Sequence, residues 1–134
     1  MLAFSKEWID ALAERLRNDE EYQKAAEGFD AIFQFIVEAE PEKGVPGRKT
    51  VGIKLPECDE TWEGIRDDAN YTMSGPYSVY YEVIQGRLGA TRAIAMRKLK
   101  VKGNLANLLK FKRATDRYVE VLGEVPSEFE GDYA

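Results

Sequence analysis

The sequence contains no histidine and only one cysteine, Cys58. Without histidine the chain cannot build a Ser-His-Asp or Cys-His catalytic group, and it has no imidazole base or metal ligand. A single cysteine excludes an intramolecular disulfide, which agrees with a cytoplasmic location. Carboxylates, tyrosines and lysines remain as acid–base groups. We therefore predict a non-catalytic, cytoplasmic protein without metal or cofactor.

A long apolar run is also missing. No stretch approaches the roughly 18 apolar residues that cross a bilayer. The N-terminal segment lacks the basic region and apolar core of a signal peptide. A length of 134 residues, with 44% hydrophobic and 32% charged residues, fits one globular domain. We expect a single domain over residues 1–134, with no stable membrane insertion.

Acidic residues are absent from RKLKVKGNLANLLKFKR (97–113), which carries seven basic residues in a chain of net charge −5. The rest of the chain therefore carries −12 and repels phosphate groups. Lysines alternate with Leu99 and Val101, which predicts a strand with a solvated basic face. No nucleic-acid-binding motif accompanies it, so we predict no nucleic-acid partner. Transient contact with a membrane, a CoA phosphate or an acidic partner stays open.

Other chemically suggestive groups have ordinary explanations. Glu38, Glu40 and Glu42 lack the spacing of a calcium loop and are expected to be solvated. Asp67 and Asp68 precede a strand, as carboxylates in turns often do. Neighbouring carboxylates should raise the pKa of Cys58, so we do not predict a nucleophile there.

Hydrophobic spacing predicts helices in the first 28 residues. One helix spans 4–17, with Ser5 as its N-cap, and a second follows Asn18 and ends at Gly28. Alternating patterns then predict strands within 31–40, 48–55, 60–66 and 71–75.

Helical spacing returns after Pro76, a residue that suits the first turn of a helix. Helices are expected at 77–86 and 89–97, followed by a strand at 98–102. Asn104 should cap a last helix, whose apolar stripe continues to Leu122. The acidic segment 126–134 is expected to fray. This order predicts an α+β protein, with a mainly antiparallel five-stranded sheet covered by helices.

Aromatic residues gather around the third and fourth strands and the following helix. They include Trp62, Tyr71, Tyr77, Tyr80 and Tyr81. Core packing accounts for most of them. The alternative is an apolar cavity with hydroxyl groups at its mouth. Periodicity does not separate a filled core from a hollow one.

Two sequence blocks carry a resemblance to a known family. ANYTMSG (69–75) and KLKVKGN (98–104) stand at the expected separation, and the likeness covers about residues 29–122. Together they resemble the sterol carrier protein family, a sterol-transfer domain found alone or fused to enzymes. Arg97 departs from the glycine that many members have there, and Asn70 replaces the commoner aspartate.

The resemblance implies a hydrophobic tunnel between sheet and helices for fatty acyl chains, acyl-CoA, sterols or similar lipids. The last helix is the natural lid. We expect the wall to contain strand and helix positions with apolar side chains: Phe33, Phe35, Val37, Val51, Ile53, Met73, Tyr77, Tyr81, Ile84, Leu99, Val101, Leu105, Leu108 and Leu109. Two alternatives stay open: an accessory or scaffolding domain with a vestigial cavity, and an enzyme that uses carboxylate or tyrosine chemistry. The ligand and the oligomeric state are not predicted.

Overall fold

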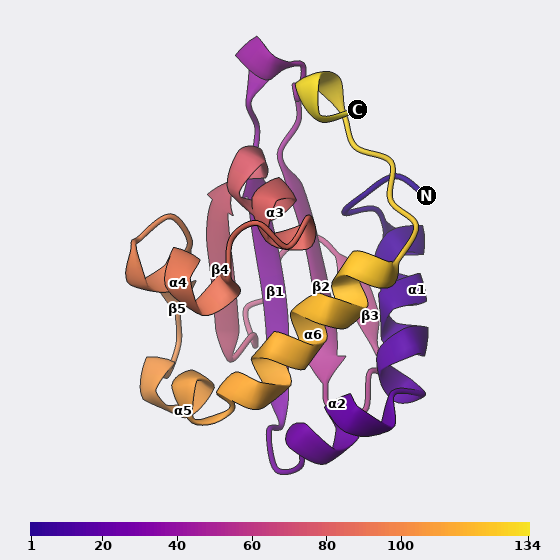
Figure 1. Ribbon diagram of the computed structural model, residues 1–134, viewed down its shortest axis with the longest axis vertical. Coiled ribbons are helices and arrows are strands. Elements are labelled where there is room, and N and C mark those ends of the chain that lie inside the picture. Colours follow the sequence, from indigo (N-terminus) through magenta and orange to yellow (C-terminus); the bar gives the residue numbers. More distant parts are fainter.

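Five strands form one mixed sheet in the computed structural model, which describes residues 1–134 (Figure 1). Their order is β3-β2-β1-β4-β5, with β1 in the centre. Strands β1 and β4 are parallel, and the other neighbours are antiparallel. The predicted α+β fold with a mainly antiparallel sheet is confirmed. The strands are β1 (Ala31–Glu38), β2 (Lys49–Leu55), β3 (Thr61–Glu63), β4 (Tyr71–Pro76) and β5 (Lys100–Lys102).

The helices gather on one side of the sheet, and α6 runs diagonally across its front (Figure 1). None of them combines the length and the apolar character needed to cross a bilayer. They are α1 (Lys6–Arg17), α2 (Glu20–Ala25), α3 (Tyr77–Ile84), α4 (Ala90–Ala95), α5 (Leu105–Lys110) and α6 (Lys112–Glu124), with short 3-10 turns at Pro41–Lys43 and Gly131–Tyr133.

The register of the sheet places apolar side chains on the face under the helices. Phe33 of β1 lies opposite Ile53 of β2, and Phe35 lies between Val51 and Met73. Residues that alternate along a strand point to the same face. This face supplies the floor of the core, as the alternation in the sequence predicts.

The alternation in β1 predicts that Gln34 points to solvent, but only 3% of it is exposed. It lies on the far face of the sheet, where the segment from β3 to β4 covers it. Its amide donates to Arg66 O (3.2 Å) and Thr72 Oγ1 (3.0 Å), and Arg66 N donates to its carbonyl (2.9 Å). Both amide N–H groups and the carbonyl oxygen thereby have a partner, which makes the burial of Gln34 tolerable.

The N-terminal caps agree with the prediction at α1 and differ at α2. Trp8 N donates to Ser5 Oγ (3.2 Å), as expected for an N-cap. Helix α2, however, is capped by Asp19, whose carboxylate accepts from Tyr22 N (2.8 Å). Asn18 instead ends α1, with its side-chain amide donating to Glu14 O (3.0 Å).

The apolar stripe predicted as one last helix is divided into two. Phe111 (φ −102°, ψ 35°) separates α5 from α6 and leaves the helical conformation. The change of direction keeps Leu108 buried but leaves Leu105 and Leu109 exposed to 40% and 46%. The prediction that these two leucines point inward is wrong for this reason.

The C-terminal segment 126–134 packs against the body instead of fraying. Glu128 forms a β-bridge with Leu2, and Glu130 N donates to the Tyr77 hydroxyl (3.0 Å). The Phe129 ring lies 4.9 Å from that of Tyr81, centroid to centroid. Three aromatic rings and a main-chain bridge therefore hold a segment whose acidic composition indicated disorder.

Arg97 occupies a left-handed backbone position, with φ of 60°. It lies in the turn between α4 and β5, where the resembled family commonly has glycine. A residue with a Cβ pays about 1–2 kcal/mol in this conformation. The side chain is exposed and forms no ion pair, so nothing visible offsets the strain.

We predict that Arg97→Gly raises the free energy of unfolding by about 1 kcal/mol, because glycine relieves this strain. Arg92→Gly, inside α4, is the matched control and should lower it by about 1 kcal/mol. Urea unfolding of both variants measures the effect. Equal destabilisation by the two substitutions would contradict the assignment of strain to Arg97.

Candidate functional site

An apolar cavity lies between the sheet and the helices. Its volume is about 70 Å³. Sixteen residues line it, and fifteen of them are hydrophobic. They are Tyr22, Phe29, Phe33, Phe35, Leu55, Met73, Tyr80, Val83, Ala90, Leu99, Leu108, Ala114, Thr115, Tyr118, Val119 and Leu122.

The floor of the cavity comes from the central strands. Phe33 and Phe35 of β1 point toward the helices, together with Met73 of β4 and Leu55 of β2. The parallel register sets Phe35 beside Met73. The rings of Phe33 and Phe35 stack at 5.0 Å between centroids. This aromatic floor follows from alternate positions of two adjacent strands.

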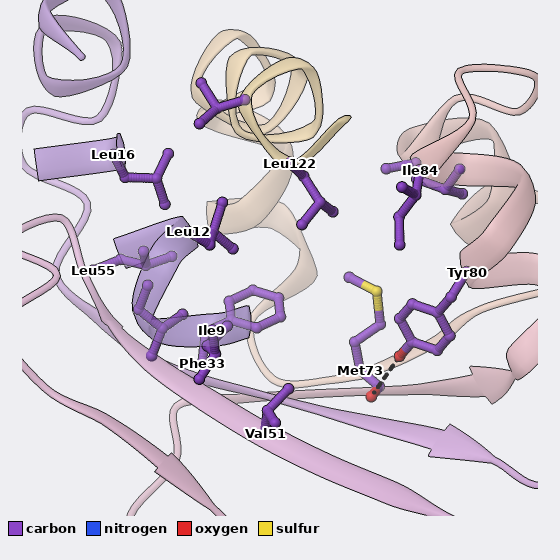
Figure 2. Close-up of a cluster of buried hydrophobic side chains, with 14 of the residues drawn as sticks. Ile9, Leu12, Leu16, Phe33, Val51, Leu55, Met73, Tyr80, Ile84 and Leu122 are labelled. Carbon is purple, nitrogen blue, oxygen red and sulfur yellow. Dashed lines mark hydrogen bonds between the residues drawn. The ribbon is translucent and has the colours of Figure 1, made fainter. Parts of the chain in front are cut away.

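The roof is one face of helix α6. Ala114, Tyr118 and Leu122 recur every four residues, a spacing that places side chains on the same side of a helix. Thr115 and Val119 widen this face. Figure 2 shows Leu122 reaching down from its helix toward the sheet, across from Phe33 and Met73. The roof is therefore apolar except at Thr115.

Tyr80 fixes helix α3 to the floor. Its hydroxyl donates to Met73 O (3.0 Å) and reaches Ile36 O (3.2 Å), so it contacts both strands of the parallel pair. Figure 2 marks the bond to Met73. Burial raises the pKa of the Tyr80 phenol well above its usual value, so the group stays protonated. It therefore acts as a permanent donor at the edge of the cavity.

Two further tyrosines face each other across the roof and the side wall. The ring centroids of Tyr22 and Tyr118 lie 6.2 Å apart, and Tyr118 also stacks on Phe35 at 6.2 Å. Burial raises the pKa of both phenols. Thr115 uses its hydroxyl on Phe111 O (3.3 Å). The cavity wall contains no carboxylate, amine or thiol, and its surface offers mainly dispersion contacts.

The roof is tied to helix α2 by an ion pair. Arg117 Nε lies 2.9 Å from Asp19 Oδ2, and its Nη2 lies 2.6 Å from Oδ1. Such two-pronged guanidinium–carboxylate pairs are both strong and directional. Exposure is low on both sides, 22% for Arg117 and 17% for Asp19. Asp19 also caps α2, so one carboxylate positions the α2 and α6 walls, which include Tyr22 and Tyr118.

The predicted wall residues divide into three groups. The structure brings Phe33, Phe35, Met73, Leu99 and Leu108 together around the cavity. Leu105 and Leu109 are exposed, as described above. The remainder lie away from the cavity: Val37, Val51, Ile53, Tyr77 and Ile84 are buried in the surrounding core, and Tyr81 and Val101 are half-buried.

Sequence reasoning missed most of the roof and the side walls. Ala114, Tyr118 and Leu122 share one side of the last helix by their spacing. Because that helix is expected to form the lid, these three residues could have been predicted to face the cavity. Tyr22 and Phe29 gave no such signal, because their place depends on how α2 docks against α6. Val83 and Ala90 likewise depend on the path of the chain between α3 and α4.

Cys58 lies outside the cavity wall and is fully buried. Burial raises the pKa of its thiol to about 12, and the carboxylates of Glu57 and Asp59 act in the same direction while Arg17 opposes them. The thiol is therefore protonated at neutral pH and chemically quiet.

Comparison with known proteins gives a consistent set of matches. Residues 9–116 match the SCP-2 sterol transfer family. A crystal structure of sterol carrier protein 2 shares 26% identity at a TM-score of 0.83, over 92% of this chain and 99% of that one. A solution structure of a conserved hypothetical protein from Thermus thermophilus, described as a candidate sterol carrier protein, shares 26% identity at 0.84, over 96% and 92%.

A more distant structure shares the fold alone. It is the palmitated sterol carrier protein 2-like 2 of Aedes aegypti, at 14% identity and a TM-score of 0.59, over 83% of this chain and 94% of that one. No curated protein sequence matches the chain.

We predict that Asp19→Ala lowers the free energy of unfolding by about 1–3 kcal/mol, because it removes an N-cap and the two-pronged partner of Arg117. Arg117 then keeps only its longer contacts to Glu21 (3.4 Å) and Glu120 (3.8 Å). Asp116→Ala is the matched control. It breaks the half-exposed Lys112–Asp116 pair (2.8 Å) on the same helix and should cost below about 0.5 kcal/mol. Urea unfolding compares the two variants. Similar losses of unfolding free energy would contradict a stabilising role for the Arg117–Asp19 pair.

A second prediction concerns pH. The Arg117 guanidinium, opposed by burial and helped by Tyr22 N, holds the pKa of the Asp19 carboxyl below its ordinary value. A pKa lower in the folded than in the unfolded state stabilises the protein above the unfolded pKa, near 3.9. This stabilisation disappears as the pH falls through the folded pKa.

Asp19→Asn keeps a capping side chain and removes the charge. The difference in unfolding free energy between wild type and Asp19→Asn should therefore be largest near neutral pH and shrink steadily below about pH 4. Unfolding curves across this range measure it. A difference that stays constant down to the acid limit would exclude an ionised Asp19 as its source.

Proposed function

Because the chain belongs to the SCP-2 sterol transfer family, we propose that it binds an apolar molecule in the cavity under α6 and transfers it chemically unchanged. Candidate ligands are fatty acyl chains, acyl-CoA and sterols. The observation that carries the proposal is the wall, where fifteen of sixteen residues are hydrophobic. A pocket of this composition recognises apolar area instead of polar groups.

The energetics favour a hydrocarbon chain. Each buried CH₂ contributes about 0.8 kcal/mol, so several methylenes suffice for useful affinity without a specific polar contact. A charged head group would lose its hydration inside such a wall and must stay at the surface. Tyr118 and Val119 are half-buried and link the interior with the outside of α6. We infer that the chain lies inside while its polar end stays in solvent.

The volume requires the cavity to expand. Pockets for drug-sized ligands measure roughly 300–1,000 Å³, several times the 70 Å³ of this cavity. We propose that α6 moves outward when a long chain enters. Phe111, where the helical conformation is interrupted, supplies a hinge at one end of α6. The Arg117–Asp19 pair restricts how far the helix separates from α2.

The small volume also favours a second candidate function. A protein with a vestigial cavity would act through contacts with an enzyme or with itself, as an accessory domain. Native mass spectrometry of the purified chain, before and after delipidation, distinguishes the two. Retained lipid in the first sample supports transfer. Absence of lipid, together with no change in melting temperature on adding palmitate, palmitoyl-CoA or cholesterol, supports the accessory role.

We predict that Val119→Phe weakens palmitate binding at least tenfold, because the ring fills space that the ligand needs. Binding is followed by displacement of a fluorescent fatty acid. Glu124→Phe, at an exposed position near the end of the same helix, is the matched control and should bind palmitate as wild type does. Thermal unfolding verifies that both variants fold. Unchanged affinity in a folded Val119→Phe protein would place the ligand elsewhere.

A further inference from the structure

One edge of the molecule carries a charge opposite to the rest. Residues 87–113, named here the basic edge, comprise α4, β5, α5, their connections and the first two residues of α6. They contain nine lysines and arginines and no aspartate or glutamate, in a chain of net charge −5. Strand β5 is the outermost strand beyond β4, and α4 and α5 lie on the same side of the molecule (Figure 1). The positive charge is therefore spatially segregated as well as contiguous in sequence.

Most of this charge is not neutralised within the protein. Of the nine basic residues, only Arg87 and Lys112 form ion pairs, with Glu82 (3.5 Å) and Asp116 (2.8 Å). The other seven side chains are on exposed residues without a carboxylate partner. Elsewhere in the chain, by contrast, Arg66 and Arg117 each contact two or more carboxylates. The basic edge thus presents free cations to an external anion.

Apolar side chains are exposed among these cations. Five large hydrophobic residues of the protein are solvent-exposed, and three of them, Met96, Leu105 and Leu109, belong to the basic edge. Leu105 and Leu109 stand four residues apart on α5 and share one side of it. Lys102, Lys110 and Lys112 flank them in the sequence. Apolar residues bordered by basic ones are typical of segments that lie at the surface of an anionic bilayer.

The same edge forms part of the cavity wall. Leu108, between the two exposed leucines, lines the cavity, as do Leu99 and Ala90. Helix α5 therefore has one apolar side toward the interior and another toward the outside. The amphipathic helix α1 offers no such outer side, because Trp8, Ile9, Leu12 and Leu16 are all buried.

We propose that the basic edge docks on the surface of an anionic lipid bilayer, with Leu105 and Leu109 entering the headgroup region. The lysines and arginines meet the lipid phosphates, and the leucines leave water. Docking needs no ligand in the cavity. It rests on the proposed function only for its purpose, which is to bring the α5 wall next to the membrane that supplies or receives the apolar molecule.

A bilayer explains the edge better than another polyanion does. Nucleic acid and acidic proteins would account for the free cations but not for the paired leucines. Aromatic stacking, which single-stranded nucleic acids use, is also unavailable. Phe111 is half-buried and turned toward Phe29, with ring centroids 4.9 Å apart.

Co-sedimentation of the full chain with vesicles tests the proposal. Vesicles of phosphatidylcholine alone are compared with vesicles of equal parts phosphatidylcholine and phosphatidylglycerol. We expect binding to the anionic vesicles, and its loss in high salt, because screening shortens the reach of the charges from about 10 Å at 0.1 M to about 3 Å at 1 M.

Two double variants and their controls locate the surface. Lys110→Glu with Arg113→Glu should weaken binding at least about 20-fold, since each basic residue contributes roughly fivefold near an anionic surface. Arg15→Glu with Lys24→Glu changes the net charge equally on exposed positions outside the edge and should have a much smaller effect. Leu105→Ser with Leu109→Ser should weaken binding severalfold, whereas Ile65→Ser, at an exposed residue elsewhere, should not.

Several outcomes overturn docking. They are no binding to anionic vesicles, equal loss from the two charge-reversal pairs, or no effect of the leucine substitutions. Affinity for duplex DNA or polyglutamate in place of vesicles would assign the edge to another partner. Palmitate binding in solution, measured on the same Leu105→Ser and Leu109→Ser protein, separates this result from the proposed function. It should equal wild type, because neither leucine lines the cavity.

Discussion

The ion pair between Arg117 and Asp19 joins the roof of the cavity to its side wall. Helix α6 carries Tyr118 and Leu122 toward the sheet, and Arg117 reaches sideways to α2 with two short contacts. The same carboxylate caps α2 and so holds Tyr22 in the opposite wall. The pair thus joins two walls of the cavity and restricts how far α6 separates from α2. Polar contacts outside the cavity thereby position apolar surfaces within it.

Much of this architecture was predictable from the sequence, because it is local. Alternation in β1 and β2 places Phe33, Phe35 and their neighbours on the covered face, and Ser5 and Asn104 cap the helices predicted for them. The boundary between α5 and α6 was not predictable, since the apolar stripe runs through Phe111 without a breaking residue. Burial of Gln34 depends on a loop that returns over the sheet. The ion pair of Asp19 with Arg117 joins residues 98 positions apart. Because the chain contains many residues of both charges, the sequence does not indicate which of them pair.

In the function proposed above, the composition of the wall and the charge of the basic edge serve two stages of one process. Uptake of an apolar molecule requires a dry surface, which the cavity provides, and a route from a bilayer, which a free cationic edge beside that cavity would shorten. The two properties meet in α5, where Leu108 faces inward and its neighbours Leu105 and Leu109 face outward. A long-range attraction followed by shallow insertion also allows release, because neither step commits the chain to spanning the membrane.

The central claim is that an apolar chain occupies the space between β1, β4 and α6. NMR of the protein with ¹³C-labelled palmitate tests it most directly, through magnetisation transfer between the ligand and protein methyl groups. The account predicts contacts from the acyl chain to the methyl groups of Leu108, Val119 and Leu122. Contacts confined to the exposed methyl groups of Leu105 and Leu109, or a complete absence of contacts at saturating palmitate, would contradict it.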